Sequence, residues 1–253
     1  MRYLLLAVAL VLAAAAVGLV PVSVEWSRRI GGPYPAEGHD VEILPDGGVI
    51  VAGRSYRNIS GSIVSVSYLA RLDQAGDVVW EKWYVGVGDA CTDVELTPDG
   101  GYVFVGKSGL AAILVKLNSS GGVEWCRRFY GRWWSMAFNV EVTPDGGYVL
   151  TGCTPPKGYE YGSQAFVLKT GASGDVEWEK LLGEDYVNDY GLDVEVAPDG
   201  GYLVLMNSFV NSSCSIMSIV KFGPDGSVVW SREYGDECRS GTDMEVTPDG
   251  GLI

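Results

Sequence analysis

Pairs of oxygen-bearing side chains recur along this chain at a spacing of two residues. Five positions carry Asp or Asn followed by Glu: Asp40/Glu42, Asp93/Glu95, Asn139/Glu141, Asp193/Glu195 and Asp243/Glu245. On a β-strand, residues i and i+2 project from the same side. Converging copies could bind Ca²⁺, which takes many oxygen ligands. We favour a structural role, because residues that recur at a fixed phase usually serve the repeat: the acids would bond to turn amides and pair with the equally periodic Arg71, Lys116, Lys169 and Lys221.

Arg132-Trp133-Trp134 is the most distinctive motif outside the periodic pattern. Two adjacent indoles can stack on a sugar ring or clasp a partner's side chain, while the indole N–H and the guanidinium give the contact direction. The full candidate ligand-binding set is Tyr130, Arg132, Trp133, Trp134, Tyr186 and Tyr190. The alternative is that one or both indoles pack beneath their loop as a small hydrophobic cluster.

Catalytic constellations are sparse. His39 is the only histidine, so a histidine-based metal site is excluded, and a Ser-His-Asp triad would depend on this residue beside Asp40. The sequence contains no Gly-x-Ser-x-Gly elbow, phosphate loop or zinc motif. We therefore expect no catalytic residues and no required cofactor, with Ca²⁺ at the acidic pairs as the alternative.

All of these residues belong to a repeat. Pro-Asp-Gly-Gly begins at Pro45, Pro98, Pro144, Pro198 and Pro248. A tryptophan recurs with it, at Trp26, Trp80, Trp125, Trp178 and Trp230, in steps of 54, 45, 53 and 52 residues. Small four-stranded sheets repeated about every 50 residues, with one aromatic marker each, are the blades of a β-propeller. The sequence predicts an all-β fold in which these tryptophans pack between blades.

The best-defined unit runs from Asp193 to Tyr234 and predicts four short strands, at residues 193–196, 202–205, 218–222 and 228–231. Pro-Asp-Gly-Gly joins the first two, because proline presets φ for a turn and the first glycine can take a positive φ. Complete units cover residues 40–86, 93–131, 139–183 and 193–235. Residues 24–30 resemble a lone fourth strand and residues 243–253 a lone first hairpin. We favour truncation of a larger ring; the alternative is a five-bladed ring with one incomplete blade.

The N-terminus and the charge indicate where the protein works. Residues 1–20 combine a basic start with an uncharged run from Leu4 to Val20, which predicts a signal peptide or an N-terminal anchor ahead of a propeller domain at residues 24–253. We expect a secreted or cell-surface protein. The net charge of −14 argues against nucleic acid as a partner. Five cysteines lack metal-ligand spacing; export permits disulfides, and their odd number leaves at least one thiol without an intramolecular partner.

The segment Val-Lys-Leu-Asn-Ser-Ser-Gly-Gly-Val-Glu-Trp, residues 115–125, resembles the tryptophan-docking repeat of quinoprotein-like propellers. The full unit is similar to secreted repeat propellers of bacteria and archaea, and the resemblance extends from residue 24 to residue 253. It implies a propeller fold and, in the enzymes of the group, pyrroloquinoline quinone held by an adjacent-cysteine disulfide or by dedicated calcium and catalytic residues. This chain has no Cys-Cys pair, so this quinone is disfavoured as a cofactor.

Loop lengths predict two unlike faces. The turns inside the unit are tight, whereas the other connections vary, since the distance from proline to the next tryptophan is 35, 27, 34 and 32 residues. Variable loops on a rigid scaffold are where binding usually resides. We therefore predict an exported, non-enzymatic propeller that binds a glycan or a surface protein through its variable-loop face. The alternatives are a fragment of a quinoprotein-like oxidoreductase and a purely structural module of the cell envelope.

Overall fold

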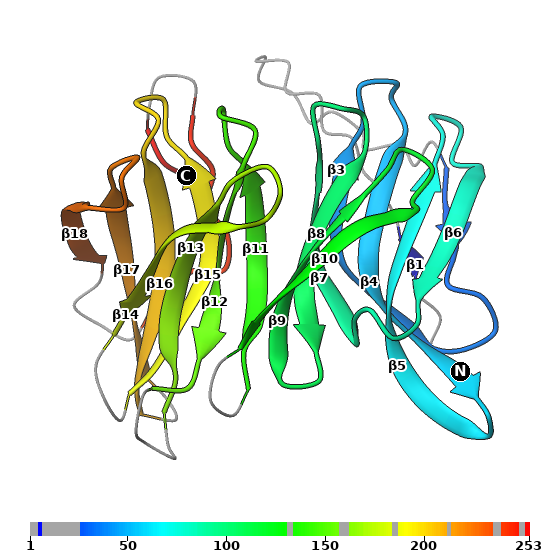
Figure 1. Ribbon diagram of the computed structural model, residues 1–253, viewed down its shortest axis with the longest axis horizontal. Helices are drawn as coiled ribbons and strands as arrows, with labels where there is room; N and C mark the ends of the chain where they lie inside the picture. Colours follow the sequence, from blue (N-terminus) through cyan, green and yellow to red (C-terminus); the bar gives the residue numbers. More distant parts are fainter. Residues whose placement is uncertain are drawn as a thin grey trace, which may run out of the picture.

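The computed structural model describes residues 5–6, 26–130, 134–156, 162–183, 187–211, 214–234, 239–247 and 251–253. Sixteen strands form four antiparallel sheets of four strands each, and in every sheet the strands follow one another in chain order. This order is that of propeller blades, so the predicted fold class is confirmed. Figure 1 shows the sheets as successive units, with the first blade on the right and the fourth on the left.

The strands of the four blades have the following bounds. Blade 1 contains β3 (Ala36–Ile43), β4 (Val49–Ile59), β5 (Ser62–Leu72) and β6 (Val78–Tyr84). Blade 2 contains β7 (Ala90–Leu96), β8 (Tyr102–Ser108), β9 (Ala111–Leu117) and β10 (Val123–Tyr130). Blade 3 contains β11 (Met136–Val142), β12 (Tyr148–Thr154), β13 (Gln164–Thr170) and β14 (Val176–Leu182). Blade 4 contains β15 (Asn188–Val196), β16 (Tyr202–Asn211), β17 (Cys214–Phe222) and β18 (Val228–Tyr234).

Two short pieces flank the blades. β2 (Arg28–Arg29) pairs with β1 (Leu5–Leu6) in an antiparallel two-stranded sheet. At the other end, Val246 and Leu252 form an antiparallel bridge, and Thr247 N–H donates to Gly251 O at 2.9 Å. We call residues 243–247 and 251–253 the C-terminal hairpin. In the described part of the chain, no helix is long and apolar enough to cross a membrane.

The Pro-Asp-Gly-Gly turn depends on its aspartate and on both glycines, as the second blade shows. Gly100 has a φ of +77°, which favours glycine. A β-carbon on Gly101 would lie 2.2 Å from the carbonyl oxygen of Leu117, so this position also excludes a side chain. The Asp99 carboxylate accepts from Gly101 N–H at 2.9 Å and from Lys116 Nζ at 2.8 Å. One aspartate therefore joins the first turn to the third strand.

The hydrophobic core consists of layers between neighbouring blades. Residues of β4 and β5 pack against residues of β7, β8 and β9, and the next layers join blade 2 to blade 3 and blade 3 to blade 4. The repeating tryptophans lie half-buried at the outer edge of these layers. Trp125 packs against Tyr148 of the next blade with ring centroids 5.9 Å apart. A β-carbon on Gly174, in the next blade's last turn, would lie 2.8 Å from the Trp125 ring. Trp26, Trp80 and Trp178 contact Gly76, Gly121 and Gly226 in the same way, so four of the repeating tryptophans dock onto the glycine turn of the following blade.

Candidate functional site

The Asp or Asn of each innermost strand links its blade to the next. Val94 N–H donates to Asp40 Oδ2 at 3.1 Å, and Val140 N–H donates to Asp93 Oδ2 at 2.7 Å. The same contact recurs twice more, from Val194 N–H to Asn139 Oδ1 at 3.0 Å and from Met244 N–H to Asp193 Oδ2 at 2.8 Å. Because the asparagine makes the same bond as the aspartates, the contact needs an oxygen acceptor and no charge.

This arrangement corrects part of the predicted role of these acids. They bond to the main chain of the following blade rather than to turn amides. The periodic bases pair instead with the turn aspartates, in the pairs Arg71–Asp46, Lys116–Asp99, Lys169–Asp145 and Lys221–Asp199. In the sequence, the acids of the innermost strands and the turn aspartates both recur at fixed positions of the repeat. Only the packing of the strands decides which of the two the base of a third strand can reach.

A β-bulge precedes the linking residue in each blade. The pairing register shifts between Gly38 and Asp40, and at the corresponding place in β7, β11 and β15. The extra residue reaches the next blade: Thr92 Oγ1 donates to Ala137 O at 2.8 Å, and His39 Nδ1 donates to Cys91 O at 2.6 Å. Because bulges re-aim side chains, the single histidine serves a contact between blades.

The glutamates of the innermost strands form a mutually repelling group. Burial, and then repulsion from Glu141, raises the pKa of Glu95 to about 9. Burial, and then repulsion from Glu195, raises the pKa of Glu141 to about 9. Glu195 has its pKa raised to about 7 by burial and by Asp193. Repulsion from Glu42 also raises the pKa of both Glu95 and Glu141, so these side chains converge from several blades. Among the described residues, no group of three or more His, Cys, Asp or Glu side chains is arranged to hold a metal ion.

Only part of the predicted ligand-binding set can be placed. Arg132, Trp133 and Tyr186 lie outside the described residues, and Tyr130 ends β10 but its side chain is outside them too. Trp134 is half-buried. Tyr190 packs between Phe138, with ring centroids 6.2 Å apart, and Phe209, with centroids 5.5 Å apart. Tyr190 thus belongs to an aromatic cluster between blades 3 and 4.

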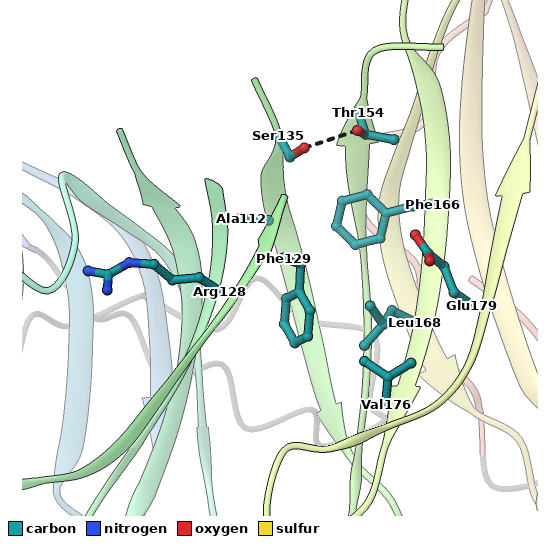
Figure 2. A pocket seen from close by; sticks show the side chains of 9 residues that line it. All are labelled: Ala112, Arg128, Phe129, Ser135, Thr154, Phe166, Leu168, Val176 and Glu179. Atoms are coloured by element: carbon teal, nitrogen blue, oxygen red, sulfur yellow. Dashed lines mark hydrogen bonds between the residues drawn. The ribbon is translucent and has the colours of Figure 1, made fainter. Parts of the chain in front are cut away.

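A cleft of about 260 Å³ lies between blades 2 and 3. Its apolar walls are Ala112 and Phe129 on one side and Phe166, Leu168 and Val176 on the other. Figure 2 shows Phe129 and Phe166 on opposite walls, with Ser135 and Thr154 at one end.

Few polar groups are available in this cleft. The Ser135 and Thr154 hydroxyls hydrogen-bond to each other at 3.0 Å. The Arg128 guanidinium turns away and donates to Gly86 O at 3.2 Å. Glu179 is exposed and supplies the carboxylate. The site therefore suits an apolar group that carries a positive charge at its end.

The cleft adjoins the connection singled out from the sequence. Phe129 and Ser135, both lining residues, bracket the segment that contains Arg132-Trp133-Trp134. Sequence reasoning missed Phe166 and Leu168, because both read as ordinary third-strand core residues. One signal could have found them: at the position of Phe166 the repeat varies, with Tyr68, Ile113 and Ser218 in the other blades. Where the side chain at one position of the repeat differs in size between blades, neighbouring blades pack more or less tightly at that point.

The cysteines divide into two groups. Cys91 and Cys153 are buried free thiols, Cys126 is a half-buried free thiol, and Cys214 is disulfide-bonded. Cys238 lies outside the described residues. Burial raises the pKa of the Cys153 thiol to about 12, which makes it unreactive at neutral pH.

No family model matches this chain, and no curated protein matches it. Several solved structures resemble this chain at low identity and low TM-score. A tail fiber of Staphylococcus aureus phage P68 is 12% identical with a TM-score of 0.41, over 80% of this chain and 41% of that one. A Synechocystis apocarotenoid oxygenase mutant is 14% identical with a TM-score of 0.46, over 87% of this chain and 54% of that one. A putative gluconolactonase is 13% identical with a TM-score of 0.41, over 87% of both chains.

This chain therefore spans about half the length of the first two of these proteins. TM-scores below 0.5 carry no argument about function, and the fold assignment rests on the order of strands in the four sheets.

Proposed function

We propose that this protein is an exported, non-enzymatic β-propeller that binds a partner through its variable-loop face, at the cleft between blades 2 and 3. The observation that supports this site most directly is its position: Phe129 and Ser135 line the cleft and flank the connection with the paired tryptophans. A rigid sheet thus lies on each side of a variable loop, an arrangement that favours binding.

A protein partner fits the cleft better than a glycan. Sugar recognition requires several accessible hydrogen-bonding groups beside an aromatic face, whereas the polar lining of this cleft is sparse: Ser135 is buried, its hydroxyl shares a hydrogen bond with that of Thr154, and the Arg128 guanidinium is directed to Gly86 O. Apolar walls and one carboxylate suit the side chain of a lysine or an arginine, whose aliphatic stem can lie on aromatic rings. The net charge of −14 also favours a basic partner.

Export remains part of this proposal and is supported by the sequence of residues 1–20 alone. The rival oxidoreductase function has a direct test. Titration with pyrroloquinoline quinone and Ca²⁺ should give neither stoichiometric binding nor dye reduction. Tight binding with dye reduction would refute the non-enzymatic proposal.

The test of the binding site compares matched variants in peptide and glycan binding screens. Glu179→Lys reverses the charge at the cleft, and Glu233→Lys makes the same change at an exposed position on β18. We expect Glu179→Lys to weaken binding of a basic peptide at least tenfold and Glu233→Lys to leave it unchanged. The double replacement of Trp133 and Trp134 by Ala should abolish binding with little change in the thermal midpoint.

Three outcomes would contradict parts of this proposal. A large fall in the thermal midpoint of the double tryptophan variant would assign both indoles to the core. Glycan binding that survives Glu179→Lys would replace the protein partner by a sugar. If all screens are blank, the structural envelope module becomes the better account.

A further inference from the structure

The cleft between blades 2 and 3 contains an aromatic residue and a glutamate that recur together in only one other blade. On β13, Phe166 lies two residues before Leu168, and Leu168 pairs directly with Glu179 of β14. Residues two apart on a strand share one side of the sheet with their cross-strand partners. Figure 2 accordingly shows the Glu179 side chain beside the Phe166 ring. The corresponding residues are Tyr68 and Glu81 in blade 1, Ile113 and Cys126 in blade 2, and Ser218 and Ser231 in blade 4.

Blade 1 shows this pair with its carboxylate occupied. The Tyr68 hydroxyl donates to Glu81 Oε1 at 2.8 Å, and Gly31 N–H donates to the same oxygen at 3.1 Å. In blade 3, Phe166 has no hydroxyl to donate. Among the residues that the structure describes, none forms a hydrogen bond or an ion pair with Glu179. The carboxylate of the cleft is therefore available to a ligand.

Blade 1 also has a cation of its own beside the pair. The Arg57 guanidinium lies 3.7 Å from the centroid of the Trp83 ring, and Trp83 packs against Tyr68 with ring centroids 5.5 Å apart. In blade 3, Pro156 and Leu181 stand at the positions of Arg57 and Trp83. Blade 1 thus holds an arginine on aromatic rings next to a glutamate, whereas blade 3 has the ring and the glutamate without the arginine.

The cleft matches a guanidinium better than an ammonium. A guanidinium is planar, so it can stack on the rings of Phe129 and Phe166 while two of its N–H groups bond to one carboxylate. An ammonium needs acceptors on several sides, and the two hydroxyls of the cleft already share a hydrogen bond at one end. The Arg128 guanidinium leaves the carboxylate free, because it donates to Gly86 O at 3.2 Å and is directed away from the cleft (Figure 2).

We propose that the cleft selects an arginine side chain of its partner, whose guanidinium stacks between Phe129 and Phe166 and pairs with Glu179. This inference rests on the proposed function, since it names the group that the same site recognises. It goes further because it excludes lysine as an equivalent ligand. The arginine N–H groups would take the place at Glu179 that the Tyr68 hydroxyl and the Gly31 amide take at Glu81.

The test compares three synthetic peptides that differ at one residue, which is arginine, lysine or citrulline. Citrulline has nearly the shape of arginine but no charge. Titration of the full chain, followed by the NMR shifts of its backbone amides, detects even weak binding. The dissociation constant of the arginine peptide should be lower than that of the lysine peptide by about tenfold or more. The citrulline peptide should give no saturable shift.

Two variants locate the site. Glu179→Gln removes the charge at nearly constant shape, and Phe166→Tyr introduces the hydroxyl that Tyr68 has in blade 1. Each should weaken binding of the arginine peptide by about tenfold or more. Glu233→Gln, at an exposed position on β18, should leave it unchanged. The thermal midpoint checks that Phe166→Tyr is folded, and Glu179→Gln tests the proposal independently because Glu179 is exposed.

The outcomes separate this inference from the proposed function. Equal binding of the arginine and lysine peptides would overturn the selection of arginine and leave the cleft as a site for basic side chains. Arginine binding that Glu179→Gln leaves undiminished would overturn the role of the carboxylate. Binding of neither peptide would overturn both the inference and the protein partner proposed for the cleft.

Discussion

Replacing Glu95 by Gln is expected to stabilise the protein at alkaline pH and to leave its stability unchanged in acid. Burial, and then repulsion from Glu141, raises the pKa of Glu95 from 4.5 to about 9. Between these values the folded state binds more protons than the unfolded chain, so stability falls as the pH rises through this window. The stability that the folded state gains by keeping Glu95 protonated is fully present below pH 4.5, and it is lost as the pH rises through about 9. Glutamine carries no charge and therefore avoids this loss.

The magnitude follows from the pKa. Each unit corresponds to about 1.4 kcal/mol, so the interval between 4.5 and pH 8 sets a ceiling of about 5 kcal/mol for Glu95. Part of this penalty is shared with Glu141, because the two carboxylates repel each other and titrate together. We expect Glu95→Gln to add about 2 kcal/mol to the free energy of unfolding at pH 8, and less than about 0.5 kcal/mol at pH 4.

Urea unfolding at pH 4 and pH 8, at constant ionic strength, measures both values. Glu233→Gln is the control, because this glutamate is exposed on β18 and far from the innermost strands. An equal effect of Glu95→Gln at both pH values would refute the electrostatic argument. A loss of stability at pH 8 would show that the ionised glutamate makes a favourable contact.

Three further replacements test the contacts between and within blades. Trp125→Ala should cost about 3 kcal/mol in urea unfolding, because the indole packs on the next blade; a cost below about 1 kcal/mol would contradict this. Asp93→Ala should cost about 2 kcal/mol and accelerate hydrogen exchange at the Val140 amide, whereas Asp93→Asn should preserve protection. Partial burial raises the pKa of Asp99, but the hydrogen bonds that Lys116 and other neighbours donate to it outweigh this effect and lower the pKa to about 2. The ionised Asp99 therefore stabilises the folded state above the unfolded pKa of 3.8, and this stabilisation is lost as the pH falls through about 2. Lys116→Met should reduce this acid-dependent loss in urea unfolding below pH 4; an unchanged profile would contradict the role of the pair.

Much of the fold was predictable because its determinants are local. A proline, an aspartate and two glycines favour a tight turn because their backbones readily adopt its conformation. Alternation of apolar and polar residues on either side of the turn predicts strands. The predicted strands at residues 202–205 and 218–222 were too short, since β16 extends to Asn211 and β17 begins at Cys214. Their polar and mixed ends lack alternation, and pairing with each other extends them beyond the pattern.

The candidate site was harder to predict. Tyr84 reads as a loop aromatic on the variable face, yet it is buried, and its hydroxyl donates to Gly121 O in the next blade at 3.0 Å. Phe129 occupies the same position in blade 2 and cannot make this bond. Such differences depend on which residues face each other across two blades, and a single sequence does not contain this information.

Local sequence patterns specify the repeating unit of this protein: four-stranded blades, their turns, and a tryptophan for each contact between neighbours. These features arise from backbone preferences and periodicity within about 50 residues, so they can be read without the rest of the chain. The packing of blades against one another sets which acid bonds to which amide, where the cleft between blades 2 and 3 lies, and why Val41 is exposed while its counterparts Val94, Val140 and Val194 in the other blades are buried. These outcomes depend on neighbouring blades, whose contacting residues are far apart in the chain.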